Sequence, residues 1–290
     1  MSESSHRRAI LITGTSSGFG MLTAARLASV GHHVFATMRD LNKKNALLDE
    51  VRKRGGTLQT LQLDVTQPDS ITSAVGTIIK ESGSIDCLVN NAGYGIGGFF
   101  EDLSDEEIRR QFEVNFFGVQ NVTRAVVPFM RERRRGKIIN ISSIAGLHAS
   151  PAFSAYNASK WALEAFSESL YYEMKFFGVD VLLVEPGTYP TKIFYDNARY
   201  ARNFSNPQSP YYPISQFLAQ KVRHYVDHSR KDPENIARLV ETLINAKNPP
   251  FRNIPDVEAR VFYYLRKMVP FRMYSWLVRT MLFRDFKESR

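Results

Sequence analysis

Tyr156 and Lys160 are the two side chains of this sequence with the strongest potential for proton transfer. Their spacing of four residues puts both on one face of a helix, about one turn apart. A free phenol has a pKa near ~10 and exchanges protons poorly at neutral pH. A neighbouring ammonium favours the phenolate, so Lys160 would lower the pKa of Tyr156. The pair is a candidate general acid/base, although the bare spacing is more often an exposed pair on a helix.

A glycine-rich turn, Thr13 to Gly20, offers a second chemical feature, an anion site. It follows the apolar run 9–12 and precedes a helical pattern, so the first backbone N–H groups of that helix lack internal partners. We expect Gly14 to supply the turn dihedrals, Gly18 to let a pyrophosphate approach the backbone, and Gly20 to allow close helix–strand packing. Alone, the pattern G-x-x-x-G-x-G also fits an ordinary glycine turn.

The alternation of short apolar runs with longer helical patterns positions both features. It is typical of an α/β fold, a single-domain Rossmann-type doubly wound parallel sheet. We expect strands at 9–12, 33–37, 58–63, 88–90, 137–141 and 180–184. We expect helices at 22–30, 42–54, 69–81, from Ser104 with some break to about 133, and at 155–177, 214–226 and 233–245. The predicted division is a catalytic domain 1–255, with a substrate lid at about 188–230, and a basic helical C-terminal extension 256–290.

Composition excludes several classes of protein. With 290 residues, 43% of them hydrophobic and 23% charged, the chain can bury a large core and disorder is not expected. The single Cys87 excludes an internal disulfide and a cysteine-based metal cluster, and we predict no metal site. No secretory segment or membrane span is recognisable, so we expect a cytoplasmic protein. The net charge of +9 is the only argument for nucleic acid, and we predict none as a partner.

Four ordered motifs closely resemble those of the short-chain dehydrogenase/reductase family, over residues 9 to about 191. They are the glycine turn, the sequence NNAG at 90–93, the Tyr156 and Lys160 pair, and the sequence PG at 186–187. By this resemblance Tyr156 is the general acid or base, and Ser143, 13 residues before it, bonds the reacting oxygen. Lys160 would bind the nicotinamide ribose and tune Tyr156, and Asn115 would hold a water. Since reaching pH 7 needs about three pKa units, we expect the cofactor's charge and burial to contribute.

The resemblance also implies a set of cofactor-binding residues. Beside Tyr156 and Lys160, this set is Gly14, Ser16, Ser17, Gly18, Phe19, Gly20, Arg39, Asp64, Val65, Asn91, Ala92, Gly93, Pro186, Gly187, Thr188 and Thr191. The end of the second strand indicates which cofactor binds. An NAD-specific fold places Asp or Glu there, whereas this chain has Met38 and then Arg39, which suits a 2′-phosphate. We therefore predict NADP(H).

An aromatic stretch after the sixth strand, 188–213, favours a large hydrophobic substrate. The candidate substrate-binding residues are Ser143, Leu147, Phe153, Tyr156, Gly187 and Tyr189. The motifs are similar to the branch containing 17β-hydroxysteroid and retinol dehydrogenases, which implies a ketone or alcohol of steroid, retinoid or lipid type. Two alternatives stay open: a 3-oxoacyl thioester reductase, and a non-catalytic NADP(H)-binding sensor.

The C-terminal segment 257–286 carries apolar residues at helical spacing with interleaved Arg and Lys. Residues 255–290 hold eight Lys or Arg and four Asp or Glu, a net charge of +4. Such helices can lie in a membrane interface, giving a peripheral contact. They can equally cap the substrate cleft or meet another subunit. The family resemblance separately implies a homo-oligomer, a dimer or tetramer formed through the helices around 106–130 and 155–177.

Overall fold

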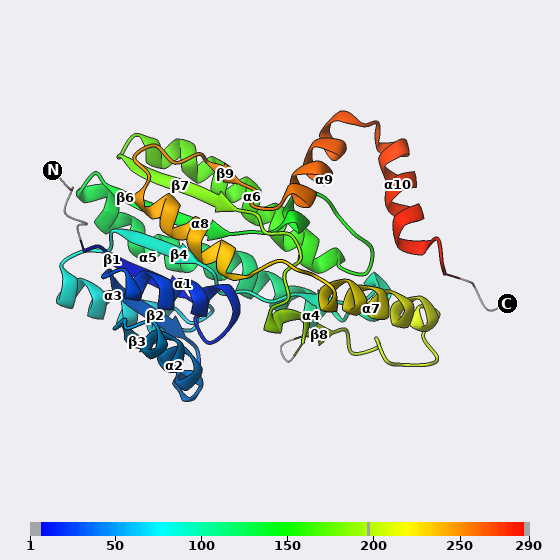
Figure 1. Cartoon of the computed structure of the whole chain (residues 1–290), viewed down its shortest axis with the longest axis horizontal. Helices are drawn as coiled ribbons and strands as arrows, with labels where there is room; N and C mark the ends of the chain where they lie inside the picture. Colours follow the sequence, from blue (N-terminus) through cyan, green and yellow to red (C-terminus); the bar gives the residue numbers. More distant parts are fainter. Residues whose placement is uncertain (1–6, 196–197, 287–290) are drawn as a thin grey trace.

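The computed structural model describes residues 7–195 and 198–286. A seven-stranded, all-parallel sheet in the order β3-β2-β1-β4-β6-β7-β9 forms the centre of the molecule (Figure 1). Its strands are β1 (Ala9–Thr13), β2 (His33–Met38), β3 (Gln59–Gln62), β4 (Cys87–Asn90), β6 (Gly136–Ile141), β7 (Val179–Val184) and β9 (Arg252–Asn253). The predicted α/β doubly wound sheet is confirmed, because strand order reverses beside β1 on its way to β4.

Helices cover both faces of this sheet. One layer is α1 (Gly18–Ser29), α2 (Asn45–Lys53) and α8 (Glu234–Asn245), and the other is α3 (Pro68–Ser82), α5 (Gly118–Glu132) and α6 (Ser154–Lys175). Alternate strand residues serve the two layers: Ile10 and Ile12 of β1 pack in the first core, whereas Ala9 and Leu11 pack in the second. Strands buried on both faces need apolar residues throughout, which explains the continuous runs in the sequence.

The remaining elements lie at the carboxyl edge of the sheet and beyond it. They include α4 (Asp105–Phe112), the π-helical turn η3 (Glu113–Phe117), α7 (Tyr212–Asp227), α9 (Val257–Met268) and α10 (Phe271–Phe283). Single-turn helices are η1 (Leu41–Lys43), η2 (Phe100–Asp102), η4 (Ile144–Gly146) and η5 (Lys192–Phe194), and a small second sheet pairs β5 (Ile96–Gly97) with β8 (Arg199–Tyr200). Figure 1 shows α7, α9 and α10 at the end of the molecule away from the N-terminus.

Several predicted boundaries were wrong for local reasons. Helix α1 begins at Gly18 rather than residue 22, because its first turn is glycine-rich and carries no apolar periodicity. Strands β5, β8 and β9 were not predicted, since each has two residues and no apolar run. The break predicted after Ser104 is the turn η3, and the Ser104–Glu107 capping box is present. Residues 1–6, 196–197 and 287–290 of the predicted domains and lid lie outside the described residues.

Candidate active site

The glycine turn is built as the sequence predicts. Gly14 has φ +71°, and a Cβ there would lie 2.7 Å from Ala92 Cα. A Cβ on Gly20 would lie 2.3 Å from Asn91 Nδ2 and 2.5 Å from the Gly14 carbonyl oxygen. The Asn91 side chain occupies that space because it donates hydrogen bonds to the carbonyl oxygens of Thr13 (2.9 Å) and Gly14 (3.0 Å). Only glycine therefore lets α1 begin this close to β4.

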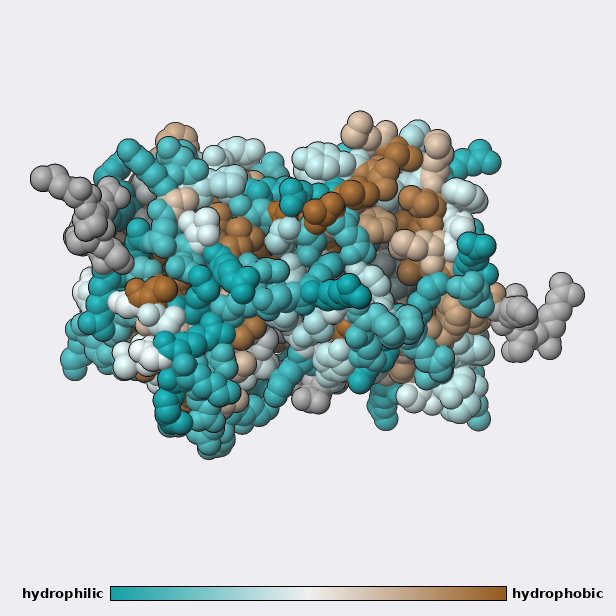
Figure 2. All heavy atoms as spheres, viewed as in Figure 1, coloured by the Kyte–Doolittle hydropathy of each residue, from teal (hydrophilic) through white to brown (hydrophobic). Residues whose placement is uncertain are grey.

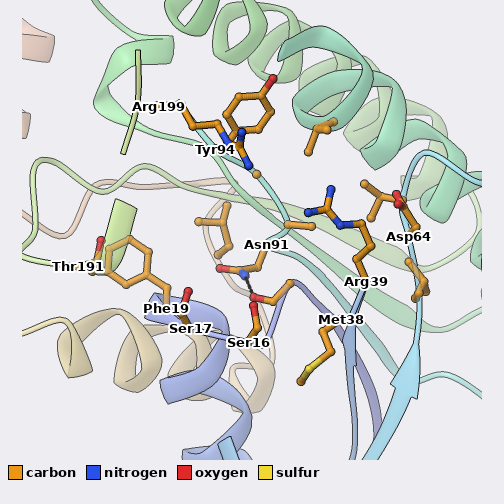
Figure 3. Close-up of a pocket in the computed structure, with 18 of the residues that line it drawn as sticks. Ser16, Ser17, Phe19, Met38, Arg39, Asp64, Asn91, Tyr94, Thr191 and Arg199 are labelled. Carbon is orange, nitrogen blue, oxygen red and sulfur yellow. Dashed lines mark hydrogen bonds between the residues drawn. The ribbon is translucent and has the colours of Figure 1, made fainter. Parts of the chain in front are cut away.

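A cleft of about 740 Å³ opens above this turn, at the point where strand order reverses. In Figure 3, Met38, Arg39 and Asp64 lie toward one end of it, and Phe19 and Thr191 toward the other. Fourteen of the predicted cofactor-binding residues line it: Gly14, Ser16, Ser17, Gly18, Phe19, Arg39, Asp64, Val65, Asn91, Ala92, Gly93, Tyr156, Lys160 and Thr191. The structure does not bring Gly20, Pro186, Gly187 and Thr188 to the cleft wall; Gly20 acts behind it, through Asn91.

The end of the cleft at β2 carries cations and no free acid from that strand. Arg39 and Lys43 line it, together with the largely buried side chain of Met38. The next carboxylate, Asp40, accepts a hydrogen bond from the Asn42 N–H (3.0 Å) and caps η1. Asp64 Oδ1 accepts from the backbone and hydroxyl of Thr66. The glycine cradle and the helix N-terminus fit the phosphates of a dinucleotide.

Tyr156, Ser143 and Lys160 meet at the other end, where β6 and α6 come together. Ser143 follows β6 and its hydroxyl acts on the Tyr156 phenol, lowering its pKa, while Tyr156 and Lys160 occupy the first turns of α6. Lys160 Nζ donates to the Ile141 carbonyl oxygen (2.9 Å) and lies 6.0 Å from the centroid of the Tyr156 ring. The three side chains predicted from the motifs are thus neighbours in space.

Burial acts on this pair in the direction opposite to our expectation. Burial raises the pKa of Tyr156, and the hydrogen bond from Ser143 opposes that rise. Burial also lowers the pKa of Lys160 to about 8, against the attraction of Glu164. The prediction that burial helps to lower the pKa of Tyr156 was wrong, because a low-dielectric site disfavours any charged form. A positive charge close to the phenol would act against this effect of burial.

Asn115 lies in the π-helical turn η3, and its amide holds the loop after β4. Its Oδ1 accepts from the Tyr94 N–H (3.1 Å), and its Nδ2 donates to the Tyr94 carbonyl oxygen (2.8 Å) and to Ser159 Oγ (3.3 Å). The extra residue of a π-turn re-aims a side chain out of the helical register. The structure thus links Asn115 to α6 one residue before Lys160, and the water-holding role stays a prediction.

A second, smaller cavity of about 90 Å³ adjoins Tyr156 on the side of α7. Phe153 and Tyr156 line it as predicted, together with Gly95, Gly97, Ala152, Phe194, Tyr200, Phe204, Leu218, Ala219 and Val222, and with Arg199 and Arg223. Its lining is predominantly apolar, as a site for a hydrophobic molecule requires. The helical pattern of α7 was visible in the sequence, but which face meets the cavity was not.

Four predicted substrate residues do not line this cavity. Ser143 acts on Tyr156 without lining the cavity, and Leu147 is buried beside η4. The Gly187 N–H donates to Asp256 Oδ2 (2.7 Å). Tyr189 is buried edge-on against Phe19, with ring centroids 5.4 Å apart, and burial and the Asp256 carboxylate raise the pKa of its phenol. Gly187 and Tyr189 therefore tie the chain after β7 to the start of α9.

Sequence reasoning missed a buried charge network behind Lys160. Arg252 of β9 donates to Glu164 Oε2 (2.7 Å) and also bonds Glu185, which is fully buried at the end of β7. Glu185 Oε2 accepts from the Asn253 N–H (2.9 Å). Glu164 lies one turn after Lys160 on α6, and burial raises the pKa of both carboxyl groups. Nothing local marks this network, since its members are 21 and 67 residues apart.

The sequence matches a known protein family and several of its members. Residues 8–200 match the profile of the family described as short chain dehydrogenase. The chain is 40% identical to a 3-ketodihydrosphingosine reductase of Bacteroides thetaiotaomicron, with 94% of each chain covered. It is 35% identical to retinol dehydrogenase 8 of Homo sapiens, over 86% of this chain and 82% of the relative.

Solved structures agree on the fold. A short chain dehydrogenase/reductase from Burkholderia phymatum in complex with NAD superposes with a TM-score of 0.78 at 26% identity, over 90% of this chain and 93% of that one. A metagenomic short-chain oxidoreductase in complex with NADP gives a TM-score of 0.67 at 28% identity, over 85% of this chain and 96% of that one. The neighbours therefore include complexes with each nicotinamide cofactor.

Proposed function

Because the chain belongs to the short chain dehydrogenase family, it is an oxidoreductase of CH–OH groups with a nicotinamide cofactor, and we propose that it interconverts a hydrophobic ketone or aldehyde with its alcohol using NADP(H). The observation that carries the proposal is the position of Tyr156. This residue lines both the dinucleotide cleft and the apolar cavity, so a proton donor lies where the two meet.

The proposed roles follow from these contacts. Tyr156 gives its phenolic proton to the substrate oxygen in reduction and takes it back in oxidation. Ser143, which acts on the same phenol, orients the same oxygen. Lys160 stabilises the phenolate electrostatically, and Asn115 holds the water that restores the proton. The bound nicotinamide supplies or accepts the hydride.

The proposed preference for NADP(H) rests on Arg39 and Lys43 at the cleft end beside β2. A 2′-phosphate would lie close to two cations there. A ribose 2′-hydroxyl would lack its usual acceptor, because Met38 stands where an NAD-specific fold has Asp or Glu. Arg39→Asp should reverse the preference by reducing kcat/KM for NADPH and raising it for NADH. The matched control is Arg52→Asp on α2, an exposed arginine outside the cleft. An unchanged NADPH to NADH ratio in Arg39→Asp would contradict the assignment.

The proposed substrate class rests on the apolar cavity and on the names of relatives. These include the sphingosine-related and retinol enzymes above and a 17-beta-hydroxysteroid dehydrogenase type 1 of Mus musculus, 33% identical over 84% of this chain and 72% of the relative. All three names describe lipid-like alcohols or ketones. The cavity supplies apolar and aromatic surface for such a molecule close to Tyr156.

The test is cofactor turnover with steroid, retinoid, ketosphingoid and 3-oxoacyl thioester substrates, each with NADP(H) and NAD(H). We expect turnover of one lipid class, lost in Tyr156→Phe while NADPH binding persists. Turnover of the thioester alone would favour the 3-oxoacyl reductase. Tight NADPH binding with no turnover of any substrate would favour the sensor.

We also propose a homo-oligomer formed through α5 and α6. Exposed aromatic side chains lie on and around these helices: Phe117, Trp161, Tyr172 and Phe176. Covering them in a second copy would remove apolar area from water. Sedimentation of wild type beside Trp161→Glu should show a smaller species for the variant, and equal masses would contradict this interface.

A further inference from the structure

The C-terminal helices α9 and α10 carry an unusual concentration of exposed apolar side chains. Among the described residues, they hold nine of the seventeen exposed large hydrophobic side chains: Val257, Val261, Tyr264, Met268, Phe271, Met273, Trp276, Leu277 and Met281. Met268 is 79% exposed and Trp276 is 67% exposed. Figure 2 shows brown and pale-brown spheres gathered at the upper right, where Figure 1 places these helices. Exposed apolar patches of this kind mark interaction sites.

Each helix is nevertheless held on the body by its other face. Phe262 of α9 stacks on His148, with ring centroids 5.4 Å apart, and Ala259 is buried. Tyr274 of α10 is buried, and Lys221 of α7 donates to the carbonyl oxygens at the end of α10 (2.9 and 3.1 Å). The helices therefore pack on α7 and on the loop that carries His148, while their outward faces stay uncovered.

The same surface carries unpaired positive charge. Six cations lie in or directly after these helices: Arg260, Arg266, Lys267, Arg272, Arg279 and Arg284. Within residues 7–195 and 198–286 none of the six forms a salt bridge. The two acids of the segment are already paired, Glu258 with Lys231 and Asp285 with Lys221. The apolar surface is thus interleaved with uncompensated cations.

We infer that the outward face of α9 and α10 docks on an anionic lipid bilayer, with its apolar side chains in the interface and its cations at the headgroups. Charge complementarity favours this occupant over a second copy of the chain. In a two-fold symmetric dimer the same face would meet itself, so the six cations would repel their equivalents. The contact is peripheral, because no helix among the described residues is long and apolar enough to cross a membrane.

Docking would bring the substrate side of the molecule to the lipid. Helix α7 lines the apolar cavity with Leu218, Ala219 and Val222, and its Lys221 holds α10. A substrate dissolved in the bilayer would then reach the cavity without crossing water. This consequence rests on the proposed function, whereas the docking itself does not.

Vesicle flotation of the full chain without substrate tests the docking. Vesicles of phosphatidylcholine alone are compared with vesicles that also contain phosphatidylserine, at low and high salt. We expect the protein to float with the anionic vesicles and to be released by salt. Arg272→Glu with Arg279→Glu should weaken binding by at least about thirtyfold, since each cation near an anionic surface contributes substantially. Trp276→Ser should weaken binding at low salt and should lower the salt concentration at which the protein leaves the vesicles.

The matched controls are Arg52→Glu with Lys53→Glu on α2, whose side chains are 77% and 75% exposed, and Phe100→Ser in η2, which is 69% exposed. They should bind like wild type, and NADPH binding shows that every variant is folded. Failure to float with anionic vesicles, or equal losses in variants and controls, would overturn the inference. The inference would also be overturned if the protein formed a dimer without lipid and only the substitution Trp276→Ser abolished that dimer. Turnover of a substrate dissolved in detergent is measured separately, so failure of the lipid docking can be distinguished from failure of the proposed activity.

Discussion

Replacing Arg252 by methionine should lower the unfolding free energy, because Arg252 is the cation of the buried charge network next to Lys160. Arg252 is the shared partner of Glu164 and Glu185, whose side chains are 8% and 0% exposed. Methionine fills similar space but leaves two buried carboxylates without their cation. Breaking a buried ion pair in this way costs about 3–5 kcal/mol of unfolding free energy. In a domain of this size that corresponds to a fall in melting temperature of roughly 5–15 °C.

The pH dependence of this loss has a definite sign. Burial already raises the pKa of Glu164, and that of Glu185 to about 8, and losing Arg252 removes an attraction that opposes the rise. A carboxyl group whose folded pKa is raised above its unfolded value near ~4.3 loses stability as pH rises between the two. The deficit of Arg252→Met should therefore be larger at about pH 8 than at about pH 5, because both groups take up protons as the pH falls.

Urea unfolding followed by circular dichroism at both pH values measures this effect. Arg26→Met is the control, because Arg26 also joins two carboxylates, Glu234 and Glu241, but in more exposed positions. The control should lose less stability and show a smaller change with pH. The argument would be refuted if Arg252→Met were as stable as wild type at about pH 8, or if its loss of unfolding free energy were the same at about pH 5.

Three further substitutions test individual contacts. Ser143→Ala should lower kcat by about 10²–10³, as for other oxyanion-site donors, with NADPH affinity retained; steady-state kinetics and a binding titration separate the two. Gly20→Ala should weaken NADPH binding and stability together, because its Cβ would lie 2.3 Å from Asn91 Nδ2; an unaltered binding titration would contradict this. Tyr189→Phe removes the hydroxyl that interacts with Asp256, so it should lower the unfolding free energy by about 1–3 kcal/mol and leave KM for substrate unchanged. A raised KM with unchanged stability would instead show that Tyr189 contacts the substrate.

The positions of the motifs could be predicted because each depends on local pattern. Continuous apolar runs mark strands buried on both faces, and the glycine turn fixes where the first helix must start. The fold and the neighbours Ser143, Tyr156 and Lys160 followed from these patterns and from the family resemblance. The cytoplasmic location and the domain division stay predictions.

The substrate residues were less predictable, because their roles depend on long-range packing. Tyr189 follows β7 directly, as a cavity residue could, yet Asp256 and Phe19 draw it into the core. Conversely, Leu218 and Val222 face the cavity only because α7 is laid across it. Sequence spacing states which residues share a helix face, but not which neighbour that face will meet.

The sequence by itself determined the sheet, the anion-binding turn and the Tyr156–Lys160 pair, since each arises from residues within one turn or one strand of each other. The tertiary structure alone decided that Arg252 compensates Glu164 and Glu185, and that burial opposes ionisation of Tyr156. It also decided that α9 and α10 pack beside α7 and the loop that carries His148, and that their apolar side chains stay exposed. These features depend on which segments, far apart in the sequence, pack together and exclude water, and a local sequence pattern does not specify that packing.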